Sequence, residues 1–179
     1  MKHFFGCAAA AALIASAACN RAPGANETAE SEEQNPAAQN VAAGSASPVD
    51  IAAVMHARHE HYETIGKGMK AIGDQMKADS PSIEVIRRHA AQIAGYGPQI
   101  LTWFPEGSGP ETGRDTRAKA EIWSDPETFR AAAQRFEQTS GAFNRAAQSG
   151  DMAAVQAALP ALRQSCSNCH DKFRGPEHH

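Results

Sequence analysis

The residues best suited to chemistry lie in the run Cys166-Ser167-Asn168-Cys169-His170. A C-x-x-C-H pattern is typical of covalent c-type haem attachment. Two thiols three residues apart lie on one face of a helix, where each can add to a haem vinyl group. The imidazole that follows them can bind the iron as its proximal ligand. The motif therefore predicts one haem c, with Cys166 and Cys169 as thioether anchors and His170 as the iron ligand.

Three other interpretations of the two cysteines are weaker. A thioredoxin-like redox pair would follow a strand in a βαβ unit, but the preceding sequence is Ala-rich with a helical pattern. A zinc site would need two more ligands, and the sequence has no second C-x-x-C or H-x-x-x-H pair. A structural disulfide is the third alternative. The adjacent His170 and the export signal described next favour haem.

The N-terminus predicts an exported protein. Residues 1–18 combine a basic start with an apolar run, which is too short to span a bilayer and is typical of a signal peptide. Cleavage at the A-x-A site of residues 15–17 would release a soluble periplasmic protein. Lipoprotein processing would instead make Cys19 the first mature residue and tether the protein to the membrane through a lipid. A lipid on Cys19 would also account for a cysteine otherwise left unpaired in an oxidising compartment.

Composition divides the rest of the chain into a linker and one domain. Residues 19–48 are poor in large apolar side chains, which predicts a disordered linker. Residues 49–179 suffice for one compact core. The formal net charge is −3 and no basic stripe with interleaved aromatic residues occurs, so we expect no nucleic-acid partner.

Helical periodicity predicts four helices in this domain. Apolar residues recur at steps of three, four and seven between residues 50 and 78, with Tyr62 among them, and again over 81–100, 124–150 and from 151 to the haem motif. Pro81 fits the first position of the second helix, with Asp79 or Ser80 as its cap. A capping box from Ser124 to Glu127 predicts the start of the third helix. With no strand signal, we expect an all-α protein, an antiparallel four-helix bundle with C-terminal haem attachment.

The chain resembles the class II c-type cytochromes, the cytochrome c′ family including its low-spin Met-ligated relatives. The resemblance runs from residue 65 to 174 and rests on the stretches MKAIG at 69–73, FPEGS at 104–108, EIWSDP at 121–126 and CSNCHDKFR at 166–174. It implies a bundle around a single haem, with Met69 at the distal position and Arg174 near the proximal side. Alternatively, Arg174 is a solvent-exposed cation with no role at the haem, which interacts favourably with the dipole at the C-terminus of its helix.

The resemblance leaves two functions open, neither of them enzymatic. In an electron carrier that serves periplasmic redox partner proteins, Met69 is the sixth iron ligand. In a gas-binding protein, Met69 only shields a five-coordinate iron, and a pocket without a hydrogen-bond donor favours nitric oxide or carbon monoxide over dioxygen. We take single-electron transfer as the general function and gas binding as the alternative. A homodimer is an alternative to a monomer.

The first helix departs from the family pattern one turn before Met69. Many members carry an arginine there, which meets a haem propionate, but this chain has Ile65. Arg58 is about three turns from Met69, which predicts that it is too distant to substitute. Gly66 and Gly68 each weaken the helix by roughly 1 kcal/mol relative to alanine. They indicate either a locally loose helix or a close approach of the backbone to haem, and we favour the close approach because both lie within one turn of Met69.

The remaining histidines are expected at the surface. A metal near residues 56–61 would find only two ligands on one helix face, so no metal site is expected there. The histidines concerned are His56, His59, His61, His89, His178 and His179.

Overall fold

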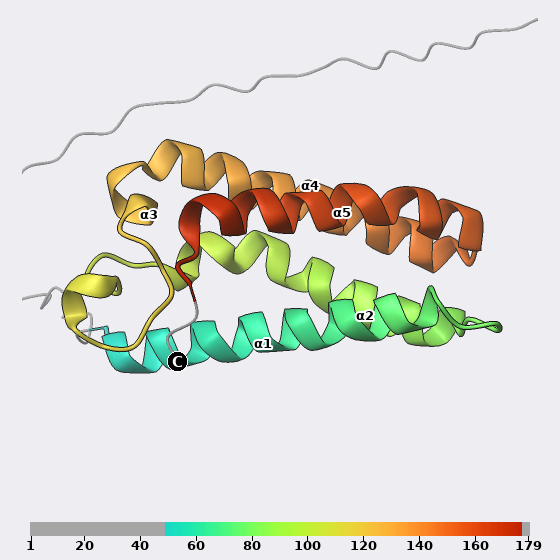
Figure 1. Ribbon diagram of the computed structural model, residues 1–179, viewed down its shortest axis with the longest axis horizontal. Helices are drawn as coiled ribbons and strands as arrows, with labels where there is room; N and C mark the ends of the chain where they lie inside the picture. The colour runs from blue at the N-terminus through green and yellow to red at the C-terminus, as the bar shows by residue number, and fades with distance from the viewer. Residues whose placement is uncertain (1–48, 177–179) are drawn as a thin grey trace, which may run out of the picture. The chain divides into compact units, whose positions relative to one another are not determined.

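The computed structural model describes residues 49–176, so the predicted signal peptide and linker lie outside the described residues, as do residues 177–179. Four long helices form an antiparallel bundle (Figure 1): α1 (Ile51–Gln75), α2 (Ile83–Tyr96), α4 (Pro126–Ser149) and α5 (Met152–Phe173). The connection from α2 to α4 contains two 3-10 helices, η1 (Gly97–Trp103) and η2 (Pro110–Thr112), and the short helix α3 (Glu121–Ser124). The predicted all-α four-helix bundle is confirmed.

The long helices pack as two pairs. Helix α1 packs against α2 and α4 against α5, and α2 joins the pairs by packing against α4. Ile72, Ile86, Phe143 and Leu162 are fully buried in the shared core. Burial of each such side chain contributes about 1.5–3 kcal/mol. Within residues 49–176, no helix is long and apolar enough to cross a bilayer.

Helix α2 begins later than predicted. Its N-cap is Ser82, whose hydroxyl accepts a hydrogen bond from the backbone N–H of Val85 at 3.4 Å. The prediction of Asp79 or Ser80 as the cap is wrong because Pro81 lies outside the helix. The backbone N–H of Ser82 donates to the Gln75 side chain at 2.7 Å, which fixes the turn at this position.

Helix α4 also has a different cap from the predicted one. Ser124 ends α3, and the carboxylate of Asp125 accepts the N–H of Thr128 at 3.3 Å. Pro126 occupies the first turn of the helix, where its missing N–H costs no intrahelical hydrogen bond. Asp125 further pairs with Lys172 of α5 at 2.7 Å, which ties the start of α4 to the end of α5.

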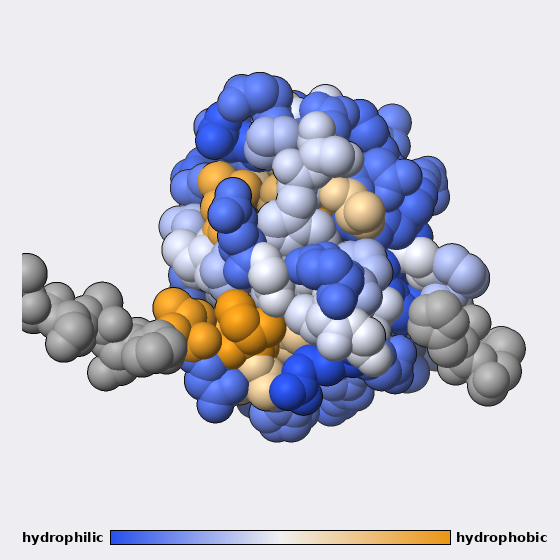
Figure 2. Space-filling view, turned by 90° about the vertical axis from the view of Figure 1, so that its left-hand side faces the viewer, coloured by the Kyte–Doolittle hydropathy of each residue, from blue (hydrophilic) through white to orange (hydrophobic). Residues whose placement is uncertain are grey.

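The connection between η1 and α3 is held against the end of α5. The N–H of Lys119 donates to the carbonyl of Phe173 at 3.0 Å, and the N–H of Gly175 to the carbonyl of Arg117 at 2.7 Å. This pairing forms the isolated β-bridge between Ala118 and Arg174. Figure 2 shows this end of the bundle, which is mostly hydrophilic with small, separate hydrophobic patches.

Candidate haem site

A cavity of about 530 Å³ lies between α1 and α5. Helix α5 contributes Cys166, Cys169 and His170, and α1 contributes Tyr62 and Met69. The volume lies within the roughly 300–1,000 Å³ of small-molecule and cofactor sites. Apolar side chains supply much of the wall, among them Ile65, Ile100, Phe104, Ile122, Phe129 and Phe136. A large, mainly apolar cavity with two thiols and an imidazole on one side fits a covalently held haem.

The two predicted anchors are half-buried free thiols on the cavity side of α5. Burial raises the pKa of the Cys166 thiol, and burial together with the neighbouring Cys166 raises that of Cys169 to about 11. Both thiols therefore stay protonated at neutral pH. Reactive redox cysteines have a lowered pKa instead, so these values count against the thioredoxin-like alternative.

His170 lies in the last turn of α5 and is also half-buried. Burial, followed by the positive charges of Arg174 and Arg117, lowers its pKa. The imidazole is therefore neutral at physiological pH, which is the form that binds a metal. Arg174 lies near His170, where the resemblance placed it, and its role at the haem stays a prediction.

Helix α1 faces the cavity with a stripe of residues three or four positions apart. The stripe extends from Met55 to Met69 and covers about four turns. Met69 is half-buried and lies at one end of it, so its role as sixth iron ligand or shield stays a prediction. Tyr62 lies midway along the stripe.

Tyr62 is a candidate distal residue that the sequence analysis did not single out. Its ring packs edge-on against Trp103, with centroids 5.4 Å apart. Burial, followed by the nearby thiol of Cys169, raises its pKa, so the phenol keeps its proton. Tyr62 lines the same cavity as Cys166 and Cys169, on the opposite wall from the haem motif. The expectation of a pocket without a hydrogen-bond donor is therefore wrong.

Arg58 lines the same cavity, although the sequence predicted that it would be too distant. That prediction is wrong because it takes Met69 as the only point of α1 that contacts the haem site, whereas the cavity follows α1 over about four turns and includes Arg58. Arg58 lies one turn before Tyr62, the relation that the resemblance led us to expect between an arginine and the distal residue. The four-residue spacing from Arg58 to Tyr62 is a sequence signal for this site, and it competes with the family-like stretch at residues 69–73.

Arg58 is 5% exposed, and its guanidinium holds the loop that follows η1. Its Nη1 donates to the carbonyl of Trp103 at 3.3 Å and the hydroxyl of Ser108 at 3.1 Å. Its Nη2 donates to the carbonyl of Ser108 at 2.9 Å and the hydroxyl of Thr116 at 3.2 Å. The charge also lies 4.6 Å from the centre of the Phe104 ring. Arg58 therefore connects α1 to the wall of the cavity.

The two glycines of α1 have different surroundings. Gly66 lines the cavity, and an added Cβ would meet nothing within 4 Å. A Cβ on Gly68 would instead lie 3.2 Å from Cδ1 of Ile93 in α2. The expectation of a close approach to haem is thus wrong for Gly68, where the small residue lets α1 and α2 pack closely.

The histidines outside the motif form no metal site in the described part of the chain. His56 and His59 are exposed as expected, and His59 lies 3.3 Å from Glu63. His61 and His89 are half-buried rather than exposed, because both lie where α1 meets α2. Residues 49–176 contain no group of three or more His, Cys, Asp or Glu side chains placed to hold a metal ion.

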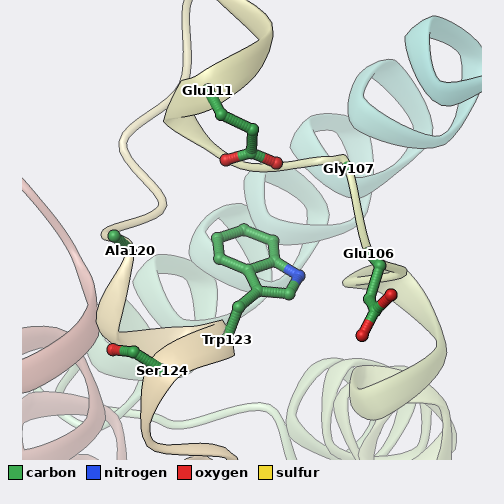
Figure 3. Close-up of a pocket in the computed structure, with 6 residues that line it drawn as sticks. All are labelled: Glu106, Gly107, Glu111, Ala120, Trp123 and Ser124. Carbon is green, nitrogen blue, oxygen red and sulfur yellow. The ribbon is translucent and has the colours of Figure 1, made fainter.

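A second hollow lies beside the loop and is lined by different residues (Figure 3). It contains Trp123 between Glu106 and Glu111. The indole Nε1 of Trp123 donates to the carbonyl of Pro105 at 3.1 Å. Trp123 thus holds the loop through Pro105.

Comparisons with known proteins match this arrangement. A family model described as Cytochrome C' matches residues 53–174. The cytochrome c′ of Rhodospirillum rubrum is 34% identical over 129 residues, which cover 72% of this chain and 86% of that protein. The solved cytochrome c′ of Rubrivivax gelatinosus is 28% identical with a TM-score of 0.62, covering 68% of this chain and 94% of that one.

A third match supports the fold alone. A variant of the cytochrome c′ of Alcaligenes xylosoxidans, described as a nitric oxide complex, gives a TM-score of 0.63 at 21% identity and covers 72% of this chain and 98% of that one. The matched region of the family model contains both the α1 stripe and the Cys-x-x-Cys-His motif.

Proposed function

The chain belongs to the cytochrome c′ family, and we propose that it is an exported haem c protein whose five-coordinate iron binds nitric oxide or carbon monoxide. The supporting observation is the cavity in which Cys166, Cys169 and His170 on α5 face Tyr62 on α1. Cys166 and Cys169 hold the haem through thioethers, and His170 binds the iron. When bound, the haem supplies an iron that exchanges one electron and takes up a diatomic ligand.

Tyr62 supports an open sixth position. A neutral phenol is a poor iron ligand, because tyrosine binds iron as the phenolate. The Tyr62 ring packs edge-on against Trp103 on the α1 side of the cavity, where it can cover the iron without binding it. The cytochrome c′ of Alcaligenes xylosoxidans, whose fold this chain shares, is described as a nitric oxide complex.

Electron transfer is the second candidate function. Met69 lines the same cavity, and a thioether on the iron would give a six-coordinate carrier with a raised reduction potential. Such a carrier would exchange single electrons with redox partner proteins in the periplasm. Neither candidate requires catalysis of a chemical conversion, and we propose no enzymatic activity.

The export signal of residues 1–18 supports a periplasmic location. The protein would be soluble there or anchored to the membrane through a lipidated Cys19. A Cys19→Ser variant distinguishes the two, because it would move a lipoprotein from the membrane fraction to the soluble fraction. It would leave the distribution of a soluble protein unchanged.

Haem attachment is tested by producing the full chain in a host that matures c-type cytochromes. We expect a coloured protein with the intact mass of one haem per chain. Replacing both Cys166 and Cys169 by serine should abolish covalent attachment, whereas Cys19→Ser, a matched control outside the motif, should retain it. A colourless product with two free thiols would refute the haem assignment. A haem protein that fails to bind carbon monoxide would refute gas binding alone.

A further inference from the structure

The α1 side of the cavity contains a hydroxyl that no other group of the described residues engages. Tyr62 lines the cavity, and among residues 49–176 its hydroxyl takes part in no hydrogen bond. Its ring lies between Trp103 and Phe104, with centroid distances of 5.4 and 6.3 Å. These contacts fix the ring, so the hydroxyl has few alternatives to facing the cavity.

The other donors on the same face of α1 are already in use. Both Nη atoms of Arg58 donate to Trp103, Ser108 or Thr116. His59 is exposed and lies against Glu63. Tyr62 is therefore the donor that α1 can offer to a molecule inside the cavity.

We infer that Tyr62 donates a hydrogen bond to the ligand bound in this cavity and so favours ligands whose outer atom carries negative charge. The inference rests on the proposed gas-binding function. Cyanide on ferric haem presents a strongly accepting nitrogen, whereas the oxygen of carbon monoxide is a weak acceptor. A hydrogen bond to a charged acceptor is stronger than one to a neutral acceptor, and more so where the surroundings are apolar. The Tyr62 hydroxyl should therefore set the preference between these ligands.

Burial keeps the donor available. It raises the pKa of Tyr62, so the O–H group is intact across the neutral range. The hydroxyl also has no bond to a protein group that must break first. The contribution of one such bond corresponds to about a 2- to 10-fold change in affinity.

The test compares Tyr62→Phe with the unmodified holoprotein, and Tyr96→Phe is the matched control. Tyr96 is the other tyrosine of the described domain; its ring also packs against Trp103, at 5.6 Å, but it does not line the cavity. Cyanide affinity of the ferric protein and carbon monoxide affinity of the ferrous protein are measured by titration. The C–O stretching frequency is measured by infrared spectroscopy in H₂O and D₂O.

We expect Tyr62→Phe to weaken cyanide binding about 2- to 10-fold and carbon monoxide binding by less than about twofold. Its C–O stretch should move to higher frequency and lose the shift between H₂O and D₂O, while Tyr96→Phe behaves as the unmodified protein. Unchanged cyanide affinity and C–O stretch in Tyr62→Phe, with carbon monoxide still bound, would overturn this inference alone. An unmodified protein that binds neither ligand would refute the proposed function and this inference together.

Discussion

Replacing Arg58 by methionine is expected to destabilise the domain strongly. Methionine keeps much of the length of the side chain but removes the guanidinium that holds the loop after η1. The backbone carbonyls of Trp103 and Ser108 then lose the donors that lie 3.3 and 2.9 Å away. Both acceptors lie in buried residues, so solvent does not readily replace the lost bonds.

The size of the effect follows from these two carbonyls. Each buried acceptor left without a partner costs about 1–3 kcal/mol, so the expected loss in the free energy of unfolding for the two carbonyls is about 2–6 kcal/mol. This is a large part of the roughly 5–15 kcal/mol that stabilises a typical domain. For a domain of this size, it corresponds to a decrease in Tm of about 8–24 °C.

Urea unfolding of the holoprotein measures this loss directly. Arg88→Met is the control, because Arg88 is exposed on α2 and has no interaction within residues 49–176. Its effect should stay within about 0.5 kcal/mol. Amide exchange of the loop at residues 104–118 should rise in Arg58→Met and stay unchanged in the control. Equal stability of the two variants would refute the role of Arg58 as the anchor of the loop.

Three further predictions follow from local geometry. Gly95→Ala should stabilise the protein by about 0.4–1 kcal/mol in urea unfolding, because nothing lies within 4 Å of the added Cβ and the unfolded chain loses entropy. Gly97→Ala should destabilise it, because its Cβ would lie 3.0 Å from the Cα of Glu137; a gain in stability there would contradict the close packing of η1 on α4. Asp125→Ala should lower Tm at neutral pH. Hydrogen bonds from Lys172 and Thr128 lower the pKa of Asp125 in the folded state, so its stabilisation is present above the ordinary aspartate pKa and lost as pH falls through the lowered value. The difference in Tm between Asp125→Ala and the unmodified protein should therefore shrink as the pH falls from the ordinary aspartate pKa through the lowered pKa of Asp125. A difference in Tm that does not change with pH would contradict the role of the Asp125 carboxylate in capping α4 and pairing with Lys172.

The features that depend on local sequence could be predicted. The placement of Cys166, Cys169 and His170 in the wall of one cavity follows from their spacing on one helix, and the helices follow from apolar periodicity. Gly150 and Asp151 separate α4 from α5 as expected, with Gly150 at φ 80° and Asp151 capping α5. The observed N-cap residues of α2 and α4 lie one to three positions after the predicted ones, because several Ser and Asp side chains near the start of each helix can act as its cap.

The distal side of the cavity could not be predicted in the same way. The periodicity of α1 shows which residues are apolar, but not which face α2 and which face the cavity. Ile72 is fully buried in the core and Gly68 packs against α2, whereas Tyr62 and Met69 line the cavity. The burial of Arg58 depends on Ser108, which lies 50 positions further along the chain. Such long-range pairing leaves no signal in a single sequence.

The most direct test of the account is the visible absorption spectrum of the ferric and ferrous holoprotein, with and without carbon monoxide, compared with that of Met69→Ala. We predict five-coordinate high-spin spectra for both proteins and ready binding of carbon monoxide by the ferrous form. A six-coordinate low-spin spectrum in the unmodified protein, converted to high-spin by Met69→Ala, would contradict the account. That result would make Met69 the sixth iron ligand and electron transfer the function.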